Sequence, residues 1–315
     1  MDENTVDFRD KNLLLKSILY SGLTGLIVGI FIFLYRLVAY QIMEISSHLY
    51  KFVVSSLNYG TIALFFLFLI FLSILMYFLV NNIEGISGGG IAQSEGVVRG
   101  QLSFEPVKTT LGVSFASLIS FLGGLSLGPE GPSVYIGTLI GSVVNKLHKI
   151  KNSFLIRDIH TAGNSAGFVG IMGTPISGMI FSIEGTNEVY DKHLILAAVV
   201  GGLVASLIAY FISLILAVDF RFINFSTISI FKLEYFYVPI LIGIFCGVGA
   251  KLFNLSLTKT ITLFNSLKKK KYLNIILIVI AFVITGVFGL MYNGFVGNGH
   301  DLIFLVINQR YLWYL

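Results

Sequence analysis

The hydrophobic pattern of the chain is a series of long uncharged runs separated by short polar segments. No Asp, Glu, Lys or Arg occurs in residues 17–35, 61–80, 109–129, 161–183, 194–218 and 272–299. Each run reaches about 18 residues or more, the length that a helix needs to cross a bilayer. The shorter runs 131–145 and 235–250 predict part-spans or tilted helices. Because the hydrophobicity is continuous rather than alternating, the pattern predicts an all-α polytopic membrane protein and not a β-barrel.

Composition agrees with a membrane domain. Hydrophobic residues make up 56% of the chain and charged residues 12%, with a mean hydropathy of +0.88, whereas a soluble domain carries roughly 25% charge. The most polar loops are expected at residues 41–58 and 219–234. We therefore expect a short N-terminal segment, residues 1–16, followed by one transmembrane domain, residues 17–315.

The basic residues lie in short connecting segments, and this placement predicts the orientation of the chain. They gather at residues 9–16, 146–157 and 268–271. Positive loops mark the cytoplasmic side of a membrane protein, so the N-terminus and the 268–271 segment are predicted to be cytoplasmic, in the cell membrane. A solvated turn explains the 268–271 lysine run equally well. In either case the net charge of +5 is not a nucleic-acid signature.

Glycine and proline placement predicts broken helices. Glycines cluster at 88–90, 123–131 and 163–173, and three of the five prolines stand in or beside these clusters. Small residues let membrane helices approach closely, which explains some of the glycines. The stretch Gly128–Pro132 (GPEGP) is different, because proline removes a donor and disfavours helix in the residue before it. We expect a break there, with a new helix beginning near Pro132.

Glu130 is the candidate functional residue, since it is a carboxylate inside this apolar segment. A helix N-terminus presents unpaired amides and a partial positive charge, which favour an anion. The ionised carboxylate would compete with a diffusing anion for that position, and protonation would release the block. The structural alternative is a helix cap, since Glu is common in first turns. A carboxylate within the membrane is a functional hypothesis by default.

Three ordered motifs resemble those of the CLC family of chloride channels and chloride/proton antiporters. Residues 128–132 are similar to the family's Gly-Lys/Arg-Glu-Gly-Pro signature, and residues 88–91 (GGGI) to its Gly-Ser-Gly-Ile-Pro motif. Residues 162–184 (AGNSAGFVGIMGTPISGMIFSIE) resemble its Ala/Gly-rich stretch that ends in an apolar run and Glu. A less specific likeness is the glycine-rich turn at 294–303 (GFVGNGHDLI).

The resemblance implies a fold, a function and a site. The fold is an inverted repeat of helices and half-helices, with a first repeat at about residues 17–218 and a partial second repeat at about 235–315. The function is transport of chloride or a related small anion, as a channel or by anion/proton exchange, in a homodimer. Glu130 corresponds to the external gating glutamate, and the expected anion-binding positions are Gly89, Gly90, Ile91, Gly131, Pro132, Ser133 and Val134.

Departures from the family pattern concern ion selectivity, proton coupling and the completeness of the second repeat. Gly89 stands where the family usually has a serine that contacts chloride. Of the two adjacent glutamates typical of antiporters, the first matches Glu184 and the second falls on Gly185. Either Glu184 or Glu188 takes the proton-transfer role, or transport is not coupled to protons. The later Gly-x-Phe-x-Pro motif and pore tyrosine are not found, so the second repeat is expected to be incomplete.

Other functions have weaker support. Residues 163–167 (GNSAG) match the Gly-x-Ser-x-Gly nucleophile pattern around Ser165, but that motif needs a strand–turn–helix elbow. An intramembrane serine hydrolase is therefore disfavoured, and no enzyme activity is expected. The histidines show no paired metal-ligand spacing, so neither a metal nor a cofactor is expected. A secondary transporter for an organic anion is the stronger rival, since such proteins also use broken helices.

Overall fold

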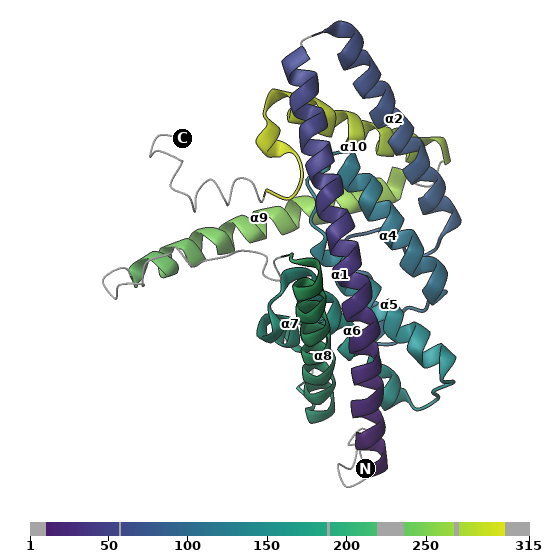
Figure 1. The fold of residues 1–315 in the computed structure, drawn as a ribbon. Helices are drawn as coiled ribbons and strands as arrows, with labels where there is room; N and C mark the ends of the chain where they lie inside the picture. Colours follow the sequence, from purple (N-terminus) through teal and green to yellow (C-terminus); the bar gives the residue numbers. More distant parts are fainter. Residues whose placement is uncertain (1–10, 57, 188–189, 219–235, 268–270, 300–315) are drawn as a thin grey trace.

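A computed structural model describes residues 11–56, 58–187, 190–218, 236–267 and 271–299, and all of its regular elements are helical. Figure 1 shows their arrangement. In chain order the elements are α1 (Lys11–Ser56), α2 (Tyr59–Asn82), α3 (Ile91–Val98), α4 (Pro106–Leu122), α5 (Glu130–Leu147), α6 (Ser153–Met172), α7 (Pro175–Phe181), the π-helical turn η1 (Ser182–Asn187), α8 (Lys192–Leu216), α9 (Tyr237–Leu267), α10 (Lys271–Met291) and the 3₁₀ turn η3 (Asn293–Phe295).

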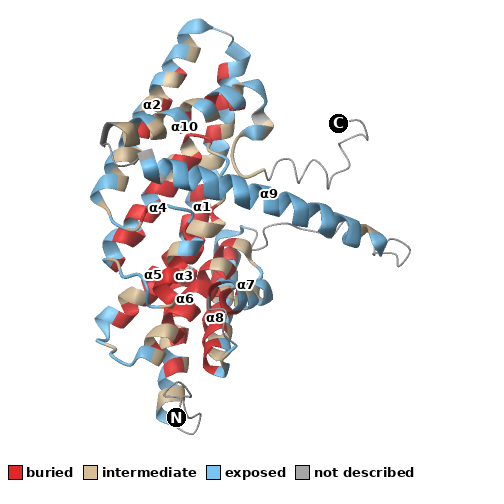
Figure 2. Ribbon diagram, turned by 180° about the vertical axis from the view of Figure 1, so that it is seen from behind, coloured by how far each residue is buried: buried red, intermediate tan, exposed pale blue. Residues whose placement is uncertain are grey.

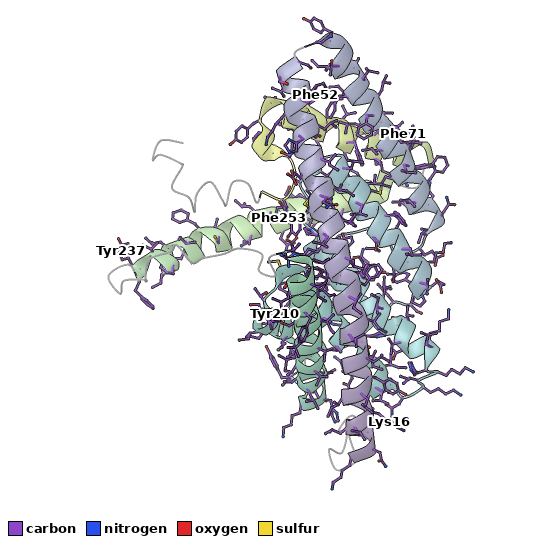
Figure 3. The ribbon with its side chains drawn as sticks, in the orientation of Figure 1. Lys16, Phe52, Phe71, Tyr210, Tyr237 and Phe253 are labelled. Atoms are coloured by element: carbon purple, nitrogen blue, oxygen red, sulfur yellow. The ribbon has the colours of Figure 1, made fainter. Side chains whose placement is uncertain are left out.

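Five of the described helices are long and apolar enough to cross a membrane. They are α1, α2, α8, most of α9 (Tyr237–Phe264) and most of α10 (Leu273–Met291). Apolar side chains cover the outside of these helices, as Phe52, Phe71 and Tyr210 illustrate in Figure 3. An apolar exterior is what the acyl chains of a bilayer require, so the helices confirm the predicted polytopic membrane protein.

The tightest part of the fold is the packing of α1, α5, α6 and α8. Their crossing points carry glycines, because a Cβ on Gly25 would overlap the Gly201 carbonyl of α8, and one on Gly137 would overlap the Gly163 carbonyl of α6. Backbones can approach this closely only where side chains are absent. Figure 2 shows the result as a concentration of buried residues around α6 and α8. This arrangement fixes the position of α5, the helix that begins at Glu130.

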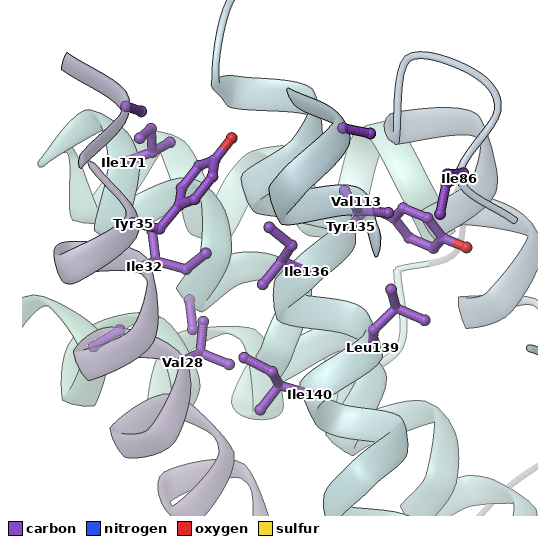
Figure 4. Close-up of a cluster of buried hydrophobic side chains, with 14 of the residues drawn as sticks. Val28, Ile32, Tyr35, Ile86, Val113, Tyr135, Ile136, Leu139, Ile140 and Ile171 are labelled. Atoms are coloured by element: carbon purple, nitrogen blue, oxygen red, sulfur yellow. The ribbon is translucent and has the colours of Figure 1, made fainter. Parts of the chain in front are cut away.

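A hydrophobic core fills the space between α1, α4 and α5. Val28, Tyr35, Ile136 and Leu139 belong to it and are almost inaccessible to solvent, as Figure 4 shows. The Tyr35 hydroxyl lies 2.7 Å from Ser117 Oγ, so this buried polar group is satisfied. The core packs the middle of α5 against α1 and α4.

A second core joins α10 to the far ends of α1 and α2. Tyr50, Phe65 and Phe282 are at most 4% exposed, and the Tyr50 hydroxyl donates to the Gly123 carbonyl at 2.8 Å. By contrast, α9 projects away from the other helices (Figures 1 and 2), and its described side chains are exposed along nearly the whole length, including Phe253. The packing of α10 is what brings the chain beyond Met291 back to the middle of the molecule.

Three predictions about the elements need correction. Residues 41–56 are not a polar loop but the last turns of α1. Of the two alternatives for the 235–250 run, the part-span is excluded, since residues 237–250 form the first half of the 31-residue helix α9. The 161–183 run is not one helix, because Gly173 ends α6 in the left-handed region (φ 66°) and Pro175 opens α7. The predicted loop at 219–234 lies outside the described residues.

Candidate functional site

The predicted break at residues 128–132 is present, and the new helix starts two residues earlier than expected. Helix α4 ends at Leu122, and α5 begins at Glu130 with Pro129 as its N-cap. Pro132 is accommodated as the third helical residue because the first-turn N–H groups of a helix have no intrahelical partner to lose. Glu130 is therefore the first residue of α5, at the end that carries the partial positive charge.

The Glu130 side chain is half-buried and folds back over Gly128. A Cβ built on Gly128 would overlap Glu130 Oε2 and would lie 2.9 Å from the carboxyl carbon. This position of the carboxylate thus depends on a residue without a side chain two positions earlier. The glycine before Pro129 has a role beyond backbone freedom, since it makes room for the acid.

The turn at 294–299 lies beside the Glu130 segment, although more than 160 residues separate them in sequence. Ser126 Oγ donates to the Phe295 carbonyl at 2.6 Å, and the Gly297 amide donates to the Gly124 carbonyl at 3.3 Å. Between the two turns is a cavity of about 400 Å³ lined by Glu130, Gly128 and Asn298 among others. The likeness noted at residues 294–303 therefore belongs to this site up to residue 299, and the rest of it lies outside the described residues.

The glycine turn at 88–90 also meets the start of α5. A Cβ on Gly90 would overlap the Gly131 carbonyl, and one on Gly131 would overlap the Gly89 carbonyl. Gly90 has φ +92°, a conformation that other residues rarely adopt. Because α3 begins at Ile91, two helices start at one point with their backbones in contact.

Hydrogen bonding narrows the set of amides that face this point. Ser133 N–H donates to the Pro129 carbonyl at 3.0 Å, and Gly90 N–H donates to Gln93 Oε1 at 3.0 Å. Pro132 has no N–H, and Val134 is far enough into α5 to bond the carbonyl four residues earlier. Gly89 lies before the first turn of α3. The Gly131 and Ile91 amides belong to the first turns of α5 and α3 and have no intrahelical partner.

A second cavity, of about 310 Å³, is lined by the 88–90 turn. Ser117, Ser120 and Tyr135 are among its polar lining residues. Tyr135 is 1% exposed, its ring reaches toward Ile86 (Figure 4), and its hydroxyl has no hydrogen-bond partner within the described residues. Buried tyrosine hydroxyls usually have a partner. Tyr135 was not among the residues predicted from the sequence, where its signal is a tyrosine between two β-branched residues in an apolar helix.

The remaining sequence candidates lie elsewhere. Glu184 is exposed in η1, next to Gly185, and Glu188 lies outside the described residues. Ser165 is fully buried in the middle of α6, where its hydroxyl donates to the Ala198 carbonyl at 2.9 Å. That is a packing role and not a nucleophile elbow. The described residues contain no group of three or more His, Cys, Asp or Glu that could hold a metal.

Comparison with known proteins identifies the family. The family model of the voltage-gated chloride channel matches residues 72–315, which is most of the chain and includes the 88–90 turn, the start of α5 and the 294–299 turn. The chain belongs to the CLC family of voltage-gated chloride channels. It is accordingly an integral, multi-pass membrane protein of a channel and transporter family and not of an enzyme family.

CLC proteins of known name are similar over different lengths. The H(+)/Cl(−) exchange transporter ClcA of Vibrio cholerae is 28% identical over 262 residues, 78% of this chain and 53% of ClcA. Chloride channel protein C of Dictyostelium discoideum is 27% identical over 188 residues, 54% of this chain and 25% of that protein. The chain thus spans about half the length of one relative and a quarter of the other.

Solved structures show the CLC fold. A slow cyanobacterial Cl⁻/H⁺ antiporter superimposes with a TM-score of 0.72 at 20% identity, covering 85% of this chain and 63% of that one. A CLC-type fluoride/proton antiporter gives a TM-score of 0.70 at 20% identity, covering 98% and 73%. The predicted all-helical CLC fold is confirmed.

In this CLC chain the departure at Gly89 is visible in space. Gly89 is exposed, and a Cβ built on it would meet nothing within 4 Å. A serine would fit there without strain, so the absence of a hydroxyl is not imposed by packing. Tyr135, on helix α5, lines the same cavity as Gly89.

Proposed function

We propose that this chain moves chloride or a related small anion across the membrane, along a path that passes the joined starts of α3 and α5 and is gated by Glu130. The observation that carries the proposal is the placement of one carboxylate as the first residue of α5, where a second helix start and the 294–299 turn converge on it. The family membership supports an anion as the substrate.

The physical reason is electrostatic. A helix N-terminus has a partial positive charge of about half an elementary charge, and the Gly131 and Ile91 amides have no intrahelical acceptor. An anion at this point gains their N–H groups in a medium where an unpaired ion is costly. The Glu130 carboxylate is itself an anion at the start of the same helix, folded back over Gly128. When ionised it excludes a halide, and when protonated it leaves the site to the halide.

We infer that Tyr135 supplies a further donor. Its hydroxyl would lie 2.8 Å from a Cβ on Gly85, in the wall of the cavity that Gly88–Gly90 also line, and it has no partner among the described residues. An anion passing this turn would satisfy it, and a phenol O–H would take the role for which the family usually has a serine at the position of Gly89.

Anion efflux from proteoliposomes tests the gate. Glu130→Gln mimics the protonated acid, so we expect chloride efflux at pH 7.5 to rise and to lose its pH dependence. Glu44→Gln is the matched control, because Glu44 is an exposed carboxylate on α1, and it should behave as the wild type. Unchanged efflux and unchanged pH response in Glu130→Gln would refute the gate.

The same vesicles separate the remaining alternatives. An inward proton movement driven by a chloride gradient would identify an exchanger, with Glu184 as the second carboxylate to test, and its absence a channel. Competition by a large organic anion, without halide flux, would favour the secondary-transporter alternative. Replacing chloride with fluoride or nitrate measures the selectivity that Gly89 and Tyr135 set.

We further propose a cytoplasmic N-terminus, in the cell membrane, and a homodimer. The start of α1 and the basic α5–α6 turn lie at one end of the molecule, since the Tyr20 and His148 rings are 5.1 Å apart. Positive charge at one end marks the cytoplasmic side. Labelling of a cysteine placed at Lys11, with Cys246 replaced by serine, by an impermeant maleimide tests the side. Light scattering should give about twice 34.7 kDa after subtraction of detergent.

A further inference from the structure

A cavity of about 620 Å³ lies at the basic end of the molecule, where α4 and α6 begin and α5 ends. We call it the basic cavity and define it by Lys146, Lys149, Lys151, Ser142, Asn145 and His160. It is at the opposite end of α5 from Glu130 and plays no part in the anion path proposed above. Its lining combines charge, buried polar groups and apolar side chains.

Positive charge is in excess at the basic cavity. Lys146 Nζ lies 3.1 Å from Glu105 Oε1, and Glu105 also accepts the Lys108 amide at 2.7 Å. Lys149 and Lys151 have no ion pair among the described residues. Three ammonium groups therefore face a single carboxylate, and two of them are available to a negatively charged ligand.

Buried polar atoms without partners lie in the same lining. Asn145 and His160 are each 8% exposed. His160 Nε2 is 2.9 Å from Ser142 Oγ and 3.1 Å from Asn145 Nδ2, whereas His160 Nδ1 and Asn145 Oδ1 have no partner within the described part of the chain. Buried polar groups nearly always have one. With Nε2 as the acceptor of both neighbours, Nδ1 carries the proton, so the lining offers one unused donor and one unused acceptor.

The rest of the wall is apolar. Leu102, Phe104, Ile150 and Ile156 line it, which a free inorganic ion would not require. A phosphate monoester accepts hydrogen bonds through its charged oxygens and, in its monoanionic form, donates one through P–OH. An occupant with a phosphate monoester at one end and apolar acyl chains at the other matches the charge, the unpaired atoms and the apolar wall together.

We propose that the basic cavity binds a phosphate monoester, presented by the headgroup of an anionic phospholipid. Basic pockets between membrane helices on the cytoplasmic side are known to hold such headgroups. Lys149 and Lys151 pair with the phosphate oxygens, and His160 and Asn145 supply the donor and the acceptor. The site is independent of Glu130, so the proposal stands whether or not the anion path is correct.

Thermal unfolding of the full chain in an uncharged detergent tests the site. The probes are dioctanoyl phosphatidic acid, dioctanoylglycerol and inorganic phosphate. We expect saturable stabilisation by phosphatidic acid and none by dioctanoylglycerol. Lys149→Gln/Lys151→Gln should weaken the half-saturating concentration about thirtyfold, since each basic residue near an anionic headgroup contributes roughly a fivefold factor.

The matched control is Lys251→Gln/Lys259→Gln, which removes the same charge from the exposed face of α9. It should leave the phosphatidic acid response unchanged. Both lysines of the test variant are on a turn and not in a core, and equal unfolding temperatures without ligand will show that the fold is kept. A His160→Phe variant, which keeps the ring volume but removes Nδ1, should also lose the response.

The responses to the three probes decide whether the basic cavity is a phosphate site. Stabilisation by inorganic phosphate with the same lysine sensitivity supports the oxyanion site and assigns its source to the free ion. Equal weakening by the α9 control, or equal stabilisation by dioctanoylglycerol, overturns the proposal, because the effect would then be bulk charge or detergent-like. No response of the wild type to any phosphate probe also overturns it and leaves the unpaired atoms to water.

Discussion

Replacing Gly128 with alanine should open the proposed gate without removing its carboxylate. The added Cβ would overlap Glu130 Oε2 and lie 2.9 Å from the carboxyl carbon. The obstructed atoms are the end of a flexible side chain, so the carboxylate moves and the backbone stays. Gly128 has a negative or extended φ, since it is not among the positive-φ glycines, and alanine fits such a conformation.

The size of the effect follows from the rotamer cost. Holding a side chain about 30° from its preferred angle costs about 0.5–1.5 kcal/mol, which lowers the ratio of blocked to unblocked protein about two- to twelvefold. Chloride efflux from proteoliposomes at pH 7.5 should rise by about the same factor, ~2–12-fold. Because the ionised acid then blocks less, the rise of efflux on acidification should become shallower.

Two variants make this result decisive. Gly22→Ala is the control, because its Cβ would meet only Val200 Cγ1 at 3.7 Å, and efflux should stay at the wild-type rate. The double variant Gly128→Ala/Glu130→Gln should equal Glu130→Gln alone, since non-additivity is expected when one residue acts only through the other. Additive effects, or a folded Gly128→Ala protein with wild-type efflux and pH response, would refute the reasoning.

Three further predictions concern packing, selectivity and pH. Gly163→Ala, whose Cβ would overlap the Gly137 carbonyl, should destabilise the fold by about 1–3 kcal/mol in thermal unfolding, whereas Gly243→Ala, with nothing within 4 Å, should not. Tyr135→Phe should lower halide efflux without lowering the unfolding temperature, because an unpartnered buried hydroxyl does not stabilise; a cooperative loss of stability would argue for a packing role. The pKa of Glu105 is lowered by a backbone amide of α4 and by a lysine ammonium, so its stabilising effect is present above its ordinary pKa and is lost as the pH falls through the lowered value. Glu105→Gln should remove a small part of the acid sensitivity of unfolding, and an identical acid profile would contradict this.

The lengths of the helices were only partly predictable, because the ends of each predicted span were placed at the nearest charged or polar residues. Residues 41–58 were expected to be a loop because they are polar, yet no glycine or proline occurs between Phe31 and Tyr59. Without a helix breaker, α1 continues to Ser56, and Tyr50 and Val53 give that part a buried face. At residues 161–183 the error is the reverse, since hydrophobicity continues through Gly173 and Pro175, which are the helix stop and start signals.

The elements of the candidate site were predictable, but their contacts were not. The GPEGP break followed from the chemistry of proline and glycine within a few residues. The contact of Gly90 with Gly131, and that of Ser126 with Phe295, join segments that are 41 and 169 residues apart, and packing of whole helices decides them. The Gln93 side chain accepts a hydrogen bond from the Gly90 amide. This amide is therefore engaged by the protein itself, which a comparison of motifs cannot show.

The two glutamates at helix starts show which observation separates a cap from a gate. Glu105 is the N-cap of α4, its carboxylate accepts the Lys108 amide, and it also meets Lys146 at the surface. Glu105 thus has the role of a helix cap, which was the alternative interpretation of Glu130. At the start of α5 the N-cap is Pro129, whose side chain makes no capping hydrogen bond. Glu130 is instead half-buried over a glycine, between two other glycine turns and facing a cavity. A helix that needed only a cap would be served by the surface arrangement of Glu105, so the buried position of Glu130 is accounted for by a role that uses its charge at that place.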